Sequence, residues 1–242
     1  MSPTRRIAIT TGVLFMTATA ASLVGAALLP ALHGTDYLAG MAGDQNRATA
    51  SALAYLIAAF GSVGIAISLY PLMRRVGEGL ALGAVVFRAL EAAMYTVGVV
   101  SLLTLLPISQ DFVTAGEDRA SLQAIGDTIV AVHDSSAVLG VFAFSAGALM
   151  YYYLFFRSRL IPQWLSGWGI VAIVLMLIAC VSAVVSGNPV TSYVALAAPI
   201  GVQEIVFALW LLIKGFSRSD LDPGVSLGQH QDAPAARVEV QA

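Results

Sequence analysis

Charged side chains are scarce in this sequence of 242 residues, in which Asp, Glu, Lys and Arg together make up 11%. Water-soluble globular proteins carry about 25% charged residues, because polar groups must cover much of their surface. Hydrophobic residues instead make up 58% of the chain, and its mean hydropathy is +0.84. The composition therefore excludes a soluble globular protein and a disordered chain, and it predicts an integral membrane protein.

Cysteine and basic residues are also few. The one cysteine, Cys180, excludes a disulfide-stapled module. Twelve Lys and Arg against fourteen Asp and Glu leave no basic excess, which argues against nucleic acid as a partner and leaves membrane lipids as the expected one. No P-loop, dinucleotide-binding glycine pattern, HExxH or CxxC occurs in the sequence. We therefore expect no metal or cofactor. The sequence does not decide whether the protein is an enzyme, but it favours one that is not.

Long apolar segments occur six times in the sequence. A helix needs about 20 apolar residues to cross the hydrocarbon layer of a membrane. The segments run from Ile7 to Leu29, Ala50 to Met73, Leu80 to Leu106, Asp134 to Phe156, Trp164 to Val185 and Tyr193 to Ile213. They predict an all-α fold, a polytopic bundle of six transmembrane helices within residues 1–216. Residues 217–242 are polar and aperiodic, which predicts a disordered cytoplasmic tail.

Lys and Arg gather at one set of segment ends, and such ends normally stay in the cytoplasm. This set holds Arg5, Arg6, Arg74, Arg75, Arg157, Arg159, Lys214 and Arg218, whereas the opposite set holds only Arg47 and Arg119. Both termini are therefore predicted to be cytoplasmic. Arg5 and Arg6 could also begin an export signal, but the apolar run after them is longer than the core of such a signal.

The connection from Pro107 to His133 has a helical pattern of its own. Apolar side chains recur there at spacings of three and four, with polar side chains between them. This pattern predicts an extra amphipathic helix on the outer side. The helix either lies on the membrane surface before the fourth span or continues directly into that span.

Three charged side chains lie inside the predicted spans, where each costs at least about 2.5 kcal/mol. Counted from the cytoplasmic ends, Arg88 lies about 12 Å deep, Glu91 about 16 Å and Glu204 about 15 Å. Arg88 and Glu91 share one helical face and can pair, and Arg88 is also expected to contact Glu204. Gln203 and Tyr95 could add hydrogen bonds to this cluster.

Two interpretations of the Arg/Glu cluster remain open. The structural one is an ion pair that fixes the packing of the third and sixth helices. The functional one rests on charge: one cation faces two carboxylates, so the cluster has one negative charge in excess. Such a group is suited to carry a proton or to bind a cation.

His133 and Asp134 form a second polar feature, at the outer interface. Of the other histidines, His33 shares this side but His230 lies in the tail, whereas a catalytic zinc usually has three protein ligands. We expect the pair to cap or solvate the outer end of the fourth helix, without a metal. A site built from His33, His133 and Asp134 is the alternative.

Small residues recur along the spans, as in Gly61 and Gly64, Gly79 and Gly83, or Gly140, Ala143 and Gly147. Small side chains let helices approach closely within lipid. Tight packing inside one chain is the simpler interpretation. A face for a homo-oligomer is the alternative.

Several stretches together resemble a family of bacterial membrane proteins, the domain of unknown function 4386 family. They are ALGAVVFRALEAA, LLPISQDFV, AVHDSSAVLG, YYYLFFRSRLIPQWLSGWG and PIGVQEIVFALWLLIKGF. The resemblance implies a six-helix protein of a bacterial inner membrane. The family's polar positions would fall on Arg88, Glu91, His133, Asp134, Arg157, Pro162, Glu204, Lys214 and Gly215. An aromatic residue follows the His-Asp pair in many relatives, whereas this chain has Ser135.

Three functions follow from these features, and the family's name does not choose among them. The first is binding or transport of a small molecule or ion at the Arg/Glu cluster. The second is a structural membrane component without catalytic activity. The third is an intramembrane or interfacial enzyme that acts on lipid at His133 and Asp134, but these residues lie roughly 15 Å above Glu204 along the membrane normal.

Overall fold

The structure is a computed structural model that describes residues 2–34, 36–188 and 190–217. Within these residues it contains helices and no strand. The elements are α1 (Pro3–Leu28), α2 (Tyr37–Gly43), α3 (Gln45–Thr114), α4 (Arg119–Ser158), α5 (Gln163–Ser186), the 3-10 helix η1 (Val190–Tyr193) and α6 (Val194–Ile213). Five of them, α1, α3, α4, α5 and α6, are long and apolar enough to cross a membrane. The predicted all-α class is confirmed; the predicted tail, from residue 218 on, lies outside the described residues.

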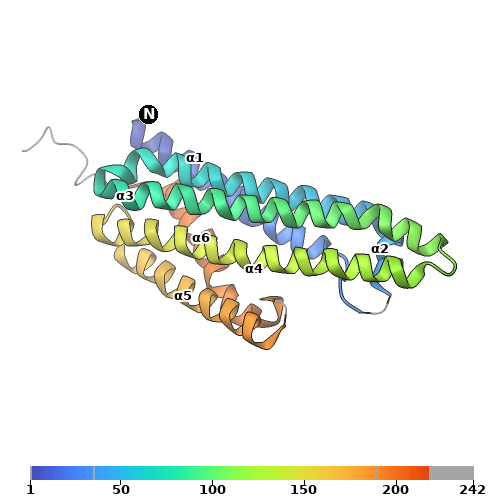
Figure 1. Ribbon diagram of the computed structural model, residues 1–242. Helices are drawn as coiled ribbons and strands as arrows, with labels where there is room; N and C mark the ends of the chain where they lie inside the picture. The colour runs from blue at the N-terminus through green and yellow to red at the C-terminus, as the bar shows by residue number, and fades with distance from the viewer. Residues whose placement is uncertain (1, 35, 189, 218–242) are drawn as a thin grey trace, which may run out of the picture.

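Helix α3 is folded back on itself at Gly77, whose φ and ψ of −171° and 99° are not helical. We call residues 45–76 the first arm of α3 and residues 78–114 the second arm. Ser62 in the first arm donates a hydrogen bond to Glu91 in the second, although 29 residues of straight helix would separate them by about 43 Å. The two arms lie side by side (Figure 1). Helix α3 therefore contains both the second and the third predicted segments.

The long helices form a ring. Helix α1 packs against α3 and α6, α3 packs against α4, and α5 packs against α4 and α6. Close approach of α1 to the first arm depends on Gly61, where an added Cβ would lie 2.9 Å from the Cβ of Ala18. The second arm meets α4 at Gly147, where an added Cβ would lie 3.2 Å from the carbonyl oxygen of Ala84. These small residues thus serve packing within the chain.

The second arm of α3 and helix α4 extend further than the sequence predicted. The second arm continues through Pro107 to Thr114, and α4 begins at Arg119 instead of Asp134. The extra amphipathic helix is therefore continuous with the fourth span, as one of the two alternatives had it. Figure 1 shows the second arm and α4 reaching well past α5 and α6.

The short helix α2 was not predicted, and it packs against the protruding part of α3 and α4. Leu38 and Met41 of α2 are fully buried there. The hydroxyl of Tyr37 donates to Oδ1 of Asp127 at 3.1 Å, and Gln123 Nε2 donates to the same oxygen at 2.8 Å. Burial, together with the hydrogen bond to Asp127 and its charge, raises the pKa of Tyr37 above the ordinary value. Tyr37 therefore stays a hydrogen-bond donor that ties α2 to α4.

Candidate functional site

Arg88 and Glu91 form the expected ion pair on the second arm of α3. Nη1 of Arg88 lies 3.0 Å from Oε2 of Glu91, and the two side chains are 3% and 4% exposed. Ser62 of the first arm donates to the same carboxylate oxygen at 2.7 Å. The guanidinium carbon of Arg88 lies 4.9 Å from the ring centre of Phe144 on α4, a cation–π contact. The positive charge of Arg88 is therefore balanced and held among three helical segments.

Glu204 on α6 has a different environment. Thr19 of α1 donates to its Oε2 at 3.1 Å, and within the described residues no Lys, Arg or His forms an ion pair with it. The expected contact between Arg88 and Glu204 is thus wrong, because Arg88 pairs with the carboxylate three residues away on its own helix. Glu204 is partly exposed, whereas Arg88 and Glu91 are buried.

The three charged side chains nevertheless line one cavity of about 220 Å³, which we call the central cavity. Both arms of α3 and each of α1, α4, α5 and α6 contribute to its wall. Its polar lining includes Thr19, Ser62, Arg88, Glu91, Tyr95 and Glu204. Most of the remaining wall is apolar, with Phe15, Phe144 and Met176 among its side chains. Arg88 Nε is buried without a hydrogen-bond partner among the described residues.

Two of the other candidates have separate places in the structure. Tyr95 lines the central cavity, one helical turn beyond Glu91. Gln203 does not join the cluster: its side chain accepts from the hydroxyl of Tyr152 at 2.5 Å and donates to the carbonyl of Leu165 at 3.2 Å. Adjacent residues of a helix point about 100° apart, so Gln203 binds α4 and α5 while Glu204 points into the cavity.

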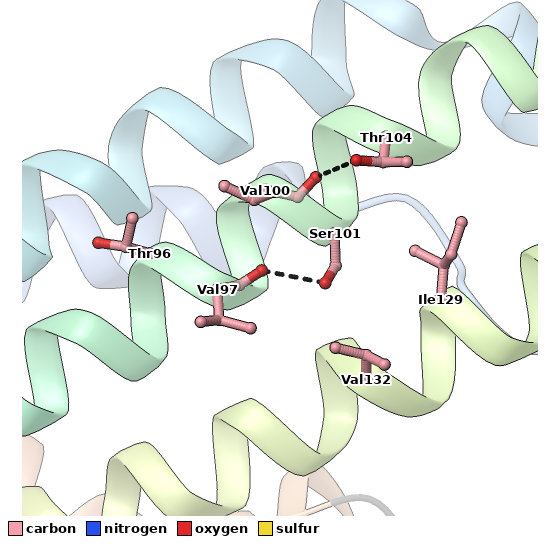
Figure 2. A pocket seen from close by; sticks show the side chains of 7 residues that line it. All are labelled: Thr96, Val97, Val100, Ser101, Thr104, Ile129 and Val132. Carbon is pink, nitrogen blue, oxygen red and sulfur yellow. Dashed lines mark hydrogen bonds between the residues drawn. The ribbon is translucent and has the colours of Figure 1, made fainter.

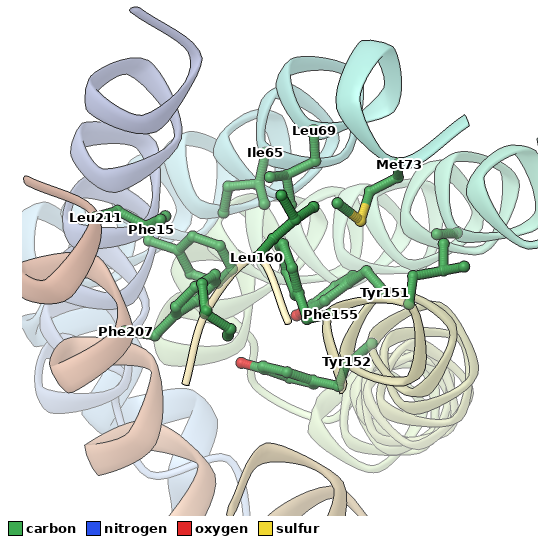
Figure 3. Close-up of a cluster of buried hydrophobic side chains, with 14 of the residues drawn as sticks. Phe15, Ile65, Leu69, Met73, Tyr151, Tyr152, Phe155, Leu160, Phe207 and Leu211 are labelled. Carbon is green, nitrogen blue, oxygen red and sulfur yellow. The ribbon is translucent and has the colours of Figure 1, made fainter. Parts of the chain in front are cut away.

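An aromatic cluster closes the interior toward the end of the bundle at which Arg5, Arg74 and Arg157 lie, which we call the arginine-rich end. Rings from α1, α4 and α6 meet there, and the ring centres of Phe15 and Phe207 are 5.1 Å apart. Tyr151, Tyr152 and Phe155 pack around them and are at most 1% exposed (Figure 3). Phe15 also lines the central cavity, so this cluster separates the cavity from the arginine-rich end of the bundle.

His133 and Asp134 lie within α4 and not at its start, so of the two predicted roles, to cap or to solvate the outer end of the fourth helix, the capping role is not formed. Nδ1 of His133 points inward and lies 3.0 Å from the carbonyl oxygen of Gly98. Asp134 points elsewhere and lies 3.5 Å from Nε2 of His33, with both side chains exposed. The three residues therefore do not converge on one point. Among the described residues no group of three or more His, Cys, Asp or Glu is arranged to hold a metal ion.

A further hollow, of about 310 Å³, is an apolar groove on the outside of α3 and α4. It lies between the second arm and α4, with Val97, Val100 and Val132 exposed along it. Its hydroxyls are occupied, because Ser101 donates to the carbonyl of Val97 and Thr104 to that of Val100 (Figure 2). A surface of this kind suits contact with lipid and offers no free polar group for chemistry.

Sequence reasoning missed Thr19, Ser62 and Phe144 as parts of the site. The hydroxyls of Thr19 and Ser62 come from α1 and the first arm of α3, which carry none of the three charged side chains. A hydroxyl in an apolar span is a weak signal by itself, since it can bond to its own helix. Only the contact between helices gives these residues a role.

Comparison with known proteins places the whole bundle in one family. A search of curated proteins found no match, and neither did a search of solved structures. The family model described as Domain of unknown function (DUF4386) matches residues 10–215, which include all five long helices almost completely. The resemblance of the sequence blocks is thereby confirmed, and the chain belongs to the DUF4386 family.

Proposed function

We propose that this chain crosses a cell membrane six times and binds a small ion or small molecule in the central cavity. One observation carries the proposal: six helical segments surround a cavity that holds a guanidinium and two carboxylates at its wall. Charged groups inside a bilayer are costly, and a cavity between them gives them access to an occupant. If the ion pair served only to hold helices together, we would expect a filled interior around it and no cavity.

The charges of the cavity favour a positively charged occupant. Arg88 and Glu91 neutralise each other at 3.0 Å, with Ser62 as a further donor to Glu91. Among the described residues Glu204 has only the hydroxyl of Thr19 as a partner, so we assign the negative charge in excess to Glu204. A proton or a small ammonium ion would neutralise it, and the mostly apolar wall of the cavity makes that neutralisation favourable. The aromatic wall at Phe15 and Phe144 suits the apolar part of an organic ammonium ion.

Thermal unfolding in detergent with propylammonium as the probe tests this function. We expect propylammonium chloride to raise Tm. At a concentration about 100 times Kd, the free energy of unfolding should increase by about 2.7 kcal/mol. Sodium chloride at the same ionic strength and neutral propanol are the controls, and neither should raise it. Glu204→Gln should lose the response, because the amide carries no negative charge.

A cavity-filling variant makes the test specific to this site. Gly201 lines the central cavity, and an added Cβ there has no atom within 4 Å. Gly201→Leu should therefore fold normally, with a small gain from helix propensity, while its side chain occupies the space of the probe. A propylammonium response that persists in Gly201→Leu would show that the probe binds elsewhere and would contradict the proposal.

The structural alternative has its own supporting observation. Arg88, Glu91 and Ser62 join the two arms of α3 within a buried network. If this is their whole role, no ammonium probe should shift Tm at any concentration, and Gly201→Leu should simply be neutral or stabilising. The same experiment therefore separates the two functions.

We propose in addition that both termini and the turn at Gly77 face the cytoplasm, because the segment ends on that side carry most of the Lys and Arg residues. Cysteine labelling of intact cells with an impermeant maleimide checks this in a Cys180→Ala background. Thr114→Cys lies at the far end of the second arm and should react from outside, whereas Glu78→Cys beside the turn at Gly77 should react only after lysis. Both positions are exposed, so burial does not confuse the result. Labelling of Glu78→Cys in intact cells would show that the orientation is the opposite of the one proposed.

A further inference from the structure

A second cavity, of about 180 Å³, lies next to the central cavity on the side away from the arginine-rich end. We call it the outer cavity. It is lined by Tyr55 of the first arm, by Gly98 of the second arm, and by His133 and Ser136 of α4. Tyr95 and Val141 line both cavities. The two spaces therefore adjoin at these two side chains.

The outer cavity has several polar groups in a mostly apolar wall. His133 Nδ1 lies 3.0 Å from the carbonyl oxygen of Gly98, and a carbonyl can only accept, so Nδ1 carries a hydrogen. In the neutral ring Nε2 is then a free acceptor. Tyr55 and Tyr95 line the same space from the α3 side. The charged neighbours on α4 and beyond are Asp134 and its partner His33, which pair with each other at 3.5 Å.

The two ends of the interior differ. Toward the arginine-rich end, the aromatic cluster at Phe15, Tyr151 and Phe155 leaves these side chains at most 1% exposed. Toward the opposite end, Tyr55, His133 and Ala137 in the outer cavity are each partly exposed. A charged occupant crosses a bundle more readily where polar groups and space replace packed rings.

From this arrangement we propose that the outer cavity is the access chamber for the central cavity, with Tyr95 and Val141 as the constriction between them. The inference rests on the proposed function, since it gives the route by which a proton or small ammonium ion reaches Glu204. His133 Nε2, Tyr55 and Tyr95 supply acceptors along this route. A competing route runs sideways between α1 and α6, where Leu23 at the rim of the central cavity is 61% exposed.

Cysteine accessibility measures this route without requiring any bound ligand. In a Cys180→Ala background, Ala58→Cys places a thiol at the central cavity, and Ser136→Cys places one at the outer cavity. Intact cells are treated with aminoethyl methanethiosulfonate, a small cationic thiol reagent, and the modified fraction is followed over time. Each reporter is combined with Val141→Trp, with Val141→Ala and, separately, with Leu23→Trp.

Val141→Trp should slow modification at Ala58→Cys by about tenfold or more, because an indole fills the passage between two small cavities. Modification at Ser136→Cys should stay within about twofold, since this reporter lies outside the constriction, and Val141→Ala should speed modification at Ala58→Cys. The modest Val141→Ala change keeps the test valid if the tryptophan variant does not fold. A slowing by Leu23→Trp without one by Val141→Trp would overturn the inference in favour of the sideways route. No reaction at Ala58→Cys from outside would also overturn it.

The two proposals fail independently. If propylammonium stabilises the protein only when Glu204 is present, but the modification rate at Ala58→Cys does not depend on Val141, the binding function stands and only the route is wrong. Accessibility that depends on Val141, without any ammonium response, would leave a constriction and remove the binding function.

Discussion

Replacing Arg88 with leucine is expected to lower the free energy of unfolding by about 3 to 5 kcal/mol, because it breaks a buried ion pair. The guanidinium is 3% exposed and pairs with Glu91 at 3.0 Å, so its removal leaves a buried carboxylate that keeps only the hydroxyl of Ser62. Thermal unfolding in detergent measures the loss. Arg75→Leu is the matched control, because Arg75 is exposed and its loss should change Tm little.

Double variants identify the true partner of Arg88. Because the ion pair joins Arg88 to Glu91, adding Glu91→Gln to Arg88→Leu should recover about 1 kcal/mol or more relative to the sum of the single losses. Adding Glu204→Gln instead should give nearly additive changes, since Glu204 forms no ion pair with Arg88. Recovery with Glu204→Gln and none with Glu91→Gln would show that the cation serves the other carboxylate.

Gly169→Leu should cost about 3 kcal/mol, because it overpacks the contact between α4 and α5. An added Cβ at Gly169 would lie 2.7 Å from two ring carbons of Tyr152. That ring cannot move aside easily, since it is fully buried and its hydroxyl donates to Gln203. Tm of the purified variant is the readout.

Gly79→Leu is the control for this substitution. An added Cβ at Gly79 has no atom within 4 Å, so the same change there should be neutral or gain about 1 kcal/mol from helix propensity. Equal losses at both positions would mean that leucine disturbs these helices in general and that the fit against Tyr152 has no special importance.

The spans could be predicted from the sequence because hydropathy and length are local properties. The structure confirms long apolar helices over these segments, with two of them joined in α3 at Gly77. The helix ends could not be predicted equally well. Pro107 is a helix breaker in water, yet α3 continues through it, because the tertiary packing of the protruding part outweighs one lost backbone hydrogen bond. Helix α2 was missed since YLAGMAG is too short to show a period.

The candidate site could be predicted only where its contacts lie within one helix. The spacing of three between Arg88 and Glu91 predicts their pairing directly. Contacts between helices depend on rotation and register, which a single sequence does not contain. Arg88 was therefore assigned a contact with Glu204 that is not formed, and Gln203 was placed in the cluster although it binds Tyr152.

Infrared difference spectroscopy of carboxyl groups tests the charge balance of the central cavity most directly. Protonated and ionised carboxyls absorb at separate C=O stretching bands, and Glu204→Gln assigns the bands of Glu204. We expect Glu204 to be protonated in the protein without ligand, because no cation of the described residues pairs with it, and to lose that proton when propylammonium binds. The band of the protonated carboxyl should then disappear in the wild type and be missing from the start in Glu204→Gln. A Glu204 that stays ionised without any added cation, or a proton that remains when the ammonium ion is present at saturation, would contradict a cavity that holds one positive charge at a time, either a proton or an ammonium ion.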